Sequence, residues 1–231
     1  GHYAKILMDE IFGEENFRRE IIWNKNNASG GKAGANNWIT THDTIFYYTK
    51  NDEAYFDKQY IPYTDEYIAE RFVHSDKDGK YRLQGDDRKQ YLSDSKGVSV
   101  TSVWEINDIN VMATERLDYA TQKPEKLLER IIKASSDKGM IVADFFGGSG
   151  VTAKVANDLG RKFITGDVGV NAIQTIRDRL AKAKVDFDIL KVQDGVRLFR
   201  NPAQTQAKIF SLIDGFAPNA DLELNTFWDG G

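Results

Sequence analysis

The sequence predicts an α/β fold built around a parallel sheet, and three observations support this. Short apolar runs alternate with segments of helical periodicity between residues 121 and 184. A glycine turn, DFFGGSGVTA at 144–153, directly follows the apolar run GMIVA. The chain has 231 residues, 41% apolar and 29% charged, so it can bury a core of its own. Strand, turn, helix, strand and helix in that order form a βαβ unit, which requires parallel strands.

The N-terminal half predicts one helix, two strands and a less regular region. The apolar residues of YAKILMDEIFG (3–13) follow helical spacing, with Gly13 as the stop signal. REIIWNK (19–25) and HDTIFYYTK (42–50) are rich in β-branched and aromatic residues, which predicts strands. The polar, glycine-rich segment 26–37 between them predicts a mobile loop. Residues 51–118 have only short apolar runs and predict an inserted or irregular subdomain.

The C-terminal half contains the βαβ unit. The segment 121–136 places Leu127, Leu128, Ile131 and Ile132 on one helical face, and Pro124 stands at its start. The elements expected next are the buried strand GMIVAD (139–144), the helix VTAKVANDLG (151–160) ended by Gly160, the strand KFITGD (162–167) and the helix NAIQTIRDRLAKAK (171–184). The tail from 187 to 216 predicts one more strand and a helix.

Composition excludes several classes of protein. The chain has no cysteine, and its three histidines lie far apart, so we expect neither disulfides nor a metal site. No apolar run approaches the ~20 residues that cross a bilayer, and no signal peptide is visible, which predicts a cytoplasmic protein without membrane contact. The net charge of −4 neither indicates nor excludes nucleic-acid binding.

The glycine turn has three interpretations: a bend without ligand, a pyrophosphate site, or a site for another nucleotide-like cofactor. Gly148, Gly150 and Ala153 fit the G-x-G-x-x-G/A pattern. Asp167 ends the next strand, where a carboxylate can accept hydrogen bonds from both ribose hydroxyls. Asp144 at the mouth of the turn disfavours a pyrophosphate and suits an ammonium or sulfonium group. Electrostatics therefore favours S-adenosylmethionine over NAD and leaves both open.

Residues 119–167 closely resemble the cofactor half of amino-methylating DNA methyltransferases, which form N6-methyladenine or N4-methylcytosine. The family pattern is Tyr-Pro-Thr-Gln-Lys-Pro, a helix, Asp-Pro-Phe-x-Gly-Ser-Gly and then Gly-x-Asp. The chain matches it at Thr121, Gln122, Lys123, Pro124, Asp144, Phe146, Gly148, Ser149, Gly150, Gly166 and Asp167. It departs from the pattern at Ala120 and Phe145, which replace two prolines.

The N-terminal third also resembles this family. HYAKILMDEIFGEENFRREIIWNK and HDTIFYYTKND are similar to segments that follow the catalytic motif in enzymes whose catalytic half precedes the cofactor half. Mod subunits of type III restriction systems share this layout. The resemblance implies a Rossmann-like S-adenosylmethionine-dependent methyltransferase fold with an irregular inserted target-recognition region. It divides the chain into the remaining part of a catalytic half (1–50), the target-recognition region (51–118), the cofactor-binding half (119–190) and a C-terminal extension (191–231).

The resemblance also implies ligands and site residues. The cofactor is expected to be S-adenosylmethionine, and the partners double-stranded DNA and a restriction subunit or second methyltransferase chain. The residues expected to line the cofactor site are Thr121, Gln122, Lys123, Asp144, Phe146, Gly148, Gly150, Thr152 and Asp167. Asp167 would hold the ribose hydroxyls, Asp144 would face the methionine end, and Phe146 would pack beside the adenosine.

The family's catalytic motif, [Asp/Asn/Ser]-Pro-Pro-aromatic, is absent from the sequence. The four prolines include no Pro-Pro pair, and Ile61-Pro62-Tyr63 is the nearest similar stretch. In the family this motif positions the poorly nucleophilic amino group of the base and stacks on the flipped base. Since the motif is absent, we predict no catalytic residue in these 231 residues. The chain is expected to be a fragment or truncated form of a site-specific methyltransferase, with adenine N6 as the expected target. The alternatives are a remnant that binds cofactor or DNA without activity, a chain completed by another chain, and an NAD-dependent oxidoreductase.

Two groups of residues are candidates for DNA contact. Arg18, Arg19, Lys25 and Lys32, with the loop at 26–37, form either a phosphate-contacting set or a solvated charged face. Three aromatic residues either stack on bases or pack locally, and local packing is favoured: Tyr81, Tyr91 and Trp104.

Overall fold

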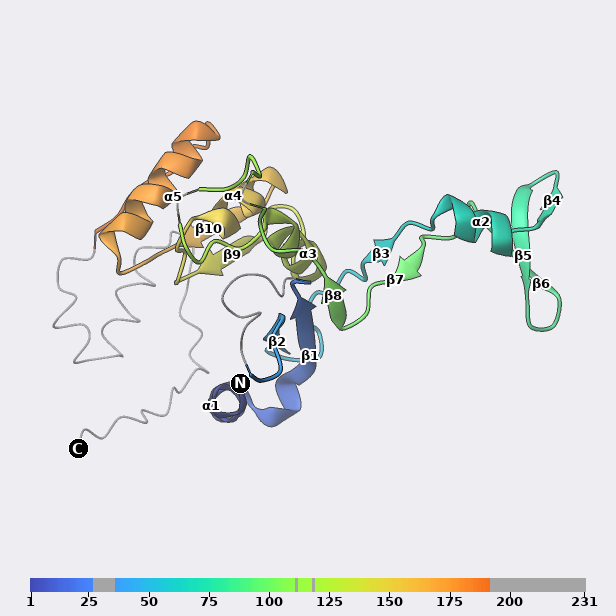
Figure 1. Ribbon diagram of the computed structural model, residues 1–231, viewed down its shortest axis with the longest axis horizontal. Coiled ribbons are helices and arrows are strands. Elements are labelled where there is room, and N and C mark those ends of the chain that lie inside the picture. Colours follow the sequence, from blue (N-terminus) through green and yellow to red (C-terminus); the bar gives the residue numbers. More distant parts are fainter. Residues whose placement is uncertain (27–35, 111, 118, 192–231) are drawn as a thin grey trace. The chain divides into compact units, whose positions relative to one another are not determined.

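The computed structural model describes residues 1–26, 36–110, 112–117 and 119–191 (Figure 1). The chain divides into two units, 1–186 and 187–231, and all the helices and strands below belong to the first. The strand and helix expected between 187 and 216 fall almost wholly outside the described residues, as does most of the loop expected at 26–37. In the described part, no helix is long and apolar enough to cross a bilayer.

The N-terminal region contains the predicted helix and two strands, and also a short 3-10 turn that the sequence pattern does not predict. They are the helix α1 (His2–Phe12), a 3-10 turn η1 (Glu14–Asn16) and the strands β1 (Phe17–Asn24) and β2 (His42–Tyr48). Gly13 ends α1 with a φ of 86°, a conformation that suits glycine. β1 pairs with β2 antiparallel and with β8 (Val103–Glu105) parallel, giving a three-stranded sheet in the order β2-β1-β8.

The C-terminal elements confirm the predicted βαβ unit. They are α3 (Glu125–Ser135), β9 (Ile141–Asp144), α4 (Val151–Asp158), β10 (Lys162–Thr165) and α5 (Val170–Lys182). β9 and β10 pair in parallel. The expected burial of β9 is wrong, because Ile141 is 52% exposed. Among the described strands β9 pairs only with β10, so its other edge has no strand partner there.

Helix α3 connects the two sheets through its apolar face. Leu127 belongs to one buried cluster with Trp23, Trp104 and Ile106 of the β1 and β8 region. Ile132 belongs to a second cluster with α4 residues, and Leu128 packs against both clusters. The predicted apolar stripe of α3 is therefore confirmed, and it places the cofactor half against the N-terminal sheet.

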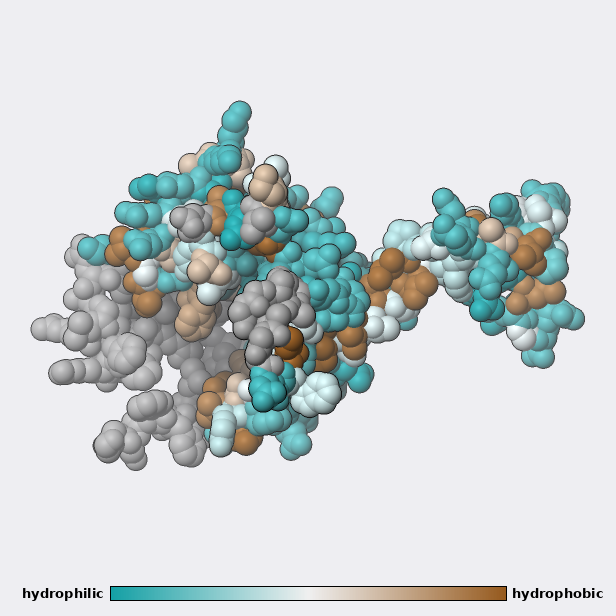
Figure 2. All heavy atoms as spheres, viewed as in Figure 1, coloured by the Kyte–Doolittle hydropathy of each residue, from teal (hydrophilic) through white to brown (hydrophobic). Residues whose placement is uncertain are grey.

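The middle region is more regular than the expected irregular subdomain. It contains β3 (Tyr60–Ile61), α2 (Asp65–Arg71), β4 (His74–Asp76), β5 (Gly79–Gln84), β6 (Arg88–Tyr91) and β7 (Val98–Ser99). β4, β5 and β6 form an antiparallel sheet, and β3 pairs with β7 as a two-stranded stem (Figure 1). Figure 2 shows hydrophobic residues at the surface of the stem. Ile61 of β3 and Val98 of β7 are each 50% exposed.

Residues 60–99, which we call the stem module, have an aromatic core of their own. Phe72 is 3% exposed and packs against Tyr63, which stacks on Tyr67 with ring centroids 4.7 Å apart. The Arg82 guanidinium lies 5.2 Å from the Phe72 ring and donates to the Tyr67 hydroxyl. Tyr63 of the Ile-Pro-Tyr stretch therefore serves local packing.

Acid is expected to loosen the stem module through Asp76. The Asp76 carboxylate accepts from Lys89 Nζ, Tyr91 Oη and the Asp78 amide, and these bonds, led by Lys89, lower its pKa below the usual 3.8. A depressed pKa stabilises the fold above the usual value, and this stabilisation is lost as pH falls through the folded pKa. Amide exchange in β4–β6, corrected for intrinsic rates, should show protection falling between about pH 5 and pH 2.

The matched control for this prediction is Asp76→Asn, which cannot ionise. It should weaken β4–β6 at neutral pH and flatten the acid dependence. An equally steep loss of protection in the variant would assign the acid sensitivity to another group.

Candidate cofactor site

The glycine turn and Asp167 emerge from the same edge of the β9–β10 pair. The two strands run parallel with Asp144 opposite Thr165, so the segments that follow them lie side by side. The Gly147 amide donates to the Gly166 carbonyl at 2.8 Å, which ties the turn to the end of β10. Gly150 then begins α4 in the left-handed conformation, with a φ of 75°. The turn is thus held by the neighbouring strand as well as by its own bends.

Asp144 is engaged by the turn that it precedes. Its Oδ1 accepts from the Phe146 amide at 3.0 Å, and its Oδ2 accepts from the Thr152 hydroxyl at 2.7 Å. The predicted site residues Asp144, Phe146 and Thr152 are therefore brought together. The carboxylate lies near the start of α4, where the helix dipole favours negative charge. Each oxygen keeps a lone pair for a further donor.

Asp167 bridges two loops. Its Oδ2 accepts from the Gly148 amide at 3.0 Å, and its Oδ1 accepts from the Gly169 amide at 2.8 Å. In a pyrophosphate site the Gly148 amide would donate a hydrogen bond to a phosphate oxygen. Here it already donates to the Asp167 carboxylate. Within the described residues, no cation pairs with Asp144 or Asp167, so this strand edge has a negative field. The described residues also include no group of three acidic or histidine side chains able to hold a metal ion.

A groove of about 560 Å³ lies beside the turn. It is lined by Tyr119, Ala120, Thr121, Asn171, Gln174, Thr175 and Asp178. Tyr119 joins the groove to the turn, because a Cβ placed on Gly148 would lie 3.3 Å from its ring. The predicted site residue Thr121 lines the same groove as Tyr119, and Phe146 is 91% exposed. Sequence reasoning missed Tyr119 and the α5 residues, although Tyr119 belongs to the matched motif stretch.

Gln122 and Lys123 lie elsewhere. The Gln122 side chain is buried and spans a loop, accepting from the Leu117 amide and donating to the Glu115 carbonyl. Lys123 Nζ lies 3.9 Å from the Asp43 carboxylate and over the Trp23 ring. These side chains do not gather with Asp144 and Asp167 around the turn. Their contacts instead fix the segment of chain that leads into α3.

The buried Arg179 of α5 is hydrogen-bonded to the backbone of the glycine turn. Arg179 Nε donates to the Ser149 carbonyl at 2.7 Å, and its Nη1 lies 3.4 Å from Glu125 Oε1. Glu125 also pairs with Lys154 of α4 at 2.9 Å. Burial lowers the pKa of Arg179, and the Glu125 charge partly opposes this shift. The sequence signal was the spacing of Arg179 with Ala172 and Ile176, which places it on the buried face of α5.

The residues suggested for DNA contact do not form one set. Arg18 and Arg19 lie at the start of β1 and Lys25 follows its other end, while Lys32 lies outside the described residues. Lys25 pairs with Asp43 at 3.1 Å. Tyr81 packs against Tyr91 with centroids 5.5 Å apart, and Trp104 is 7% exposed. Local packing therefore accounts for these three aromatic residues.

The site thus consists of a glycine turn flanked by two carboxylates, Asp144 and Asp167, and a neighbouring groove that Tyr119 lines. A family model described as DNA methylase, for N6 and N4 methylation, matches residues 1–178. This chain belongs to the DNA methylase family. Its fold is that of Rossmann-like methyltransferases, as likeness to the cytosine-N4-specific PvuII DNA methyltransferase shows. The TM-score is 0.50 at 16% identity, covering 82% of this chain and 58% of the other.

Two curated relatives of this DNA methylase chain are named as DNA methyltransferases. It is 30% identical to the type II methyltransferase M1.MboII of Moraxella bovis over 68% of this chain and 60% of that protein. It is 49% identical to the DNA adenine methyltransferase YhdJ of Escherichia coli K12 over 27% of this chain and 21% of that protein. The matches of the DNA methylase chain thus cover less than two thirds of each relative. The type III layout stays a prediction.

Proposed function

We propose that this chain binds S-adenosylmethionine for methyl transfer to an exocyclic amino group of DNA. The observation that carries the proposal is the pair of carboxylates, Asp144 and Asp167, at adjoining strand ends beside the glycine turn. A cofactor with ammonium and sulfonium charges and no phosphate fits this negative field. A pyrophosphate would meet two carboxylates and a Gly148 amide that is already bound.

The cofactor orientation follows from the same contacts. The Asp167 oxygens keep lone pairs that can accept from the two ribose hydroxyls. Asp144 lies at the start of the turn, where its charge favours the methionine end. Phe146 and Tyr119 offer aromatic surface for the adenine, since Phe146 is exposed and Tyr119 adjoins Gly148. S-adenosylmethionine supplies the methyl group, and these residues bind and orient it.

We propose adenine N6 as the methylated position. The support is the name of the YhdJ relative, a DNA adenine methyltransferase, whose matched segment is 49% identical to this chain. The PvuII likeness, at 16% identity, supports the fold alone. Double-stranded DNA is the proposed substrate, with residues 51–118 as the target-recognition region, and a restriction subunit or a second methyltransferase chain is a proposed partner.

Methyl transfer requires groups that these 231 residues do not contain. The sequence has no Pro-Pro pair, and Tyr63 of the nearest similar stretch is packed on Tyr67. We therefore propose that this stretch of chain binds cofactor and transfers methyl groups very poorly by itself. The catalytic motif would come from another segment of a longer chain or from a second chain. Incubation with labelled S-adenosylmethionine and DNA should give no more than background incorporation.

Ligand-dependent melting tests the cofactor proposal. S-adenosylhomocysteine at ~100 times its dissociation constant should stabilise the protein by ~2.7 kcal/mol and raise Tm by several degrees, whereas NAD should not. Asp167→Asn removes a charge and one backbone acceptor, so calorimetry should show S-adenosylhomocysteine binding at least ~10-fold more weakly. The exposed Asp186→Asn is the matched control and should bind normally. Stabilisation by NAD alone would contradict the proposal.

A further inference from the structure

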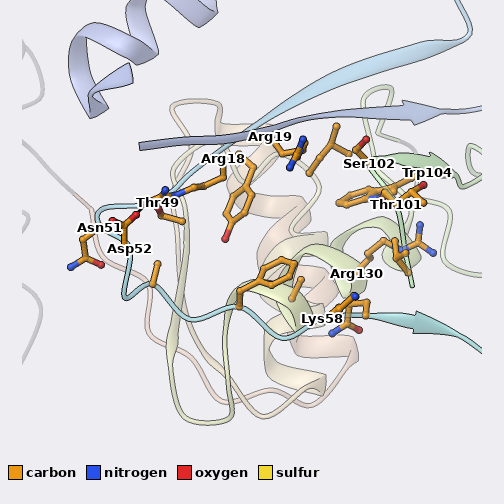
Figure 3. A pocket seen from close by; sticks show the side chains of 17 residues that line it. Arg18, Arg19, Thr49, Asn51, Asp52, Lys58, Thr101, Ser102, Trp104 and Arg130 are labelled. Atoms are coloured by element: carbon orange, nitrogen blue, oxygen red, sulfur yellow. Dashed lines mark hydrogen bonds and ion pairs between the residues drawn. The ribbon is translucent and has the colours of Figure 1, made fainter. Parts of the chain in front are cut away.

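A cavity separate from the glycine turn lies between helix α3 and the N-terminal sheet. Its volume is about 620 Å³, within the usual range of ligand pockets. Figure 3 shows its walls, which come from the start of β1, the end of β2, the segments 51–59 and 100–102, and α3. None of its lining residues belongs to the turn or to the groove beside the turn. The cofactor proposal therefore leaves this cavity unexplained.

Among the charged side chains that line the cavity, cations outnumber carboxylates. Its cations are Arg18, Arg19, Lys58 and Arg130, and its one carboxylate is Asp52, which pairs with Arg18 at 2.6 Å. For the other three cations, no ion pair occurs within the described residues. Burial lowers the pKa of Arg130, as expected of a cation that has lost water without gaining a carboxylate. Figure 3 shows the four cationic groups distributed around the cavity. This charge fits an anion.

Aromatic rings form the other part of the lining. Tyr47 and Phe56 lie nearly parallel, with centroids 6.1 Å apart and an interplanar angle of 29°. Trp104 also lines the cavity, and its indole N–H donates to the Thr101 carbonyl, which fixes the ring. Aromatic faces beside a cationic surface are the combination that binds unpaired nucleotides, because bases stack while phosphates are neutralised. An inorganic anion would leave the rings unused.

We propose that this cavity binds a nucleotide, with its phosphate attracted by the positive charges of Arg19, Lys58 and Arg130 and its base against Tyr47 and Phe56. The ligand is either a free nucleoside monophosphate or one nucleotide of a DNA strand, since both present the same groups. The site is distinct from the cofactor site and does not depend on how the cofactor is bound.

Equilibrium dialysis of the full chain with dAMP tests the proposal. Saturable one-to-one binding is expected, and deoxyadenosine or inorganic phosphate alone should bind at least ~10-fold more weakly. Saturating S-adenosylhomocysteine should leave dAMP binding unchanged. A 5′-phosphorylated single-stranded oligonucleotide that competes with dAMP identifies a DNA strand as the source, and failure to compete identifies a free nucleotide.

Variants assign the binding to this cavity. Arg19→Ala with Lys58→Ala changes two exposed residues and should weaken dAMP binding at least ~10-fold. Lys77→Ala with Lys80→Ala in the stem module makes the same charge change and should have no effect. Phe56→Ala should weaken dAMP binding about fivefold or more and leave phosphate binding unchanged. The proposal is overturned if dAMP does not bind, if S-adenosylhomocysteine displaces it, or if the Arg19/Lys58 variant binds it normally.

Discussion

Gly150→Ala is expected to lower the free energy of unfolding by about 3 kcal/mol. Two independent penalties add at this position. The backbone φ of 75° is left-handed, which costs a residue with a Cβ about 1–2 kcal/mol. The new Cβ would also lie 3.0 Å from the Ile176 Cα, and α5 backbone can move away only by disturbing its own packing. Urea unfolding followed by circular dichroism measures the change.

Gly160→Ala separates the two penalties. Gly160 has nearly the same φ, 74°, but the nearest atom to its Cβ is the flexible Lys138 Cγ at 3.7 Å. This variant should therefore lose only about 1–2 kcal/mol. Gly166→Ala, with open space around the Cβ, should be close to neutral. Equal losses in the Gly150 and Gly160 variants would show that contact with Ile176 contributes nothing.

Arg179→Met is expected to destabilise the protein by about 3 kcal/mol. The Arg179 side chain is 6% exposed, and the change removes its pair with Glu125 and its hydrogen bond to the Ser149 carbonyl. Removing one partner of a buried pair typically costs about 3–5 kcal/mol, and the low end applies because Glu125 keeps Lys154. Because Ser149 is in the glycine turn, S-adenosylhomocysteine affinity should fall as well.

A double-mutant cycle identifies the contact responsible. In urea unfolding, the double variant Arg179→Met/Glu125→Gln should lose less free energy of unfolding than the sum of the two single variants, because both substitutions remove the same pair. Arg177→Met is the control on the same helix, since Arg177 is exposed and its one ion pair among the described residues is with its neighbour Asp178. It should change stability by less than about 0.5 kcal/mol. Strict additivity at Arg179 and Glu125 would refute the buried pair as the source of stability.

The βαβ unit was predictable because its signals are local. Pro124 before α3, Gly150 at the start of α4 and Gly160 after its end each mark a boundary through their own backbone chemistry. The positions of Asp144 and Asp167 beside the turn were predictable for the same reason, since Asp144 ends β9 and Asp167 lies two residues after β10. Parallel pairing then brought the two strand ends together.

Other features depend on contacts that sequence spacing does not encode. The strands β4 to β6 are short and mostly polar, so their pairing rests on cross-strand contacts such as Tyr81 with Tyr91. Gln122 and Lys123 are in the matched motif, yet their partners, Glu115 and Asp43, decide where the side chains point. The exposure of β9 likewise depends on which strands pair with it.

The stem has a consequence for how such a chain can change over evolutionary time. In its two strands Tyr60 pairs with Ser99 and Ile61 with Val98. The Val100 amide donates to the Gln59 carbonyl, so the two ends of the stem module lie next to each other where they join the rest of the chain. Insertions whose ends lie together are tolerated because the host backbone need not adjust. One recombination event could therefore replace residues 60–99 as a single unit, while α3 and the glycine turn keep their contacts.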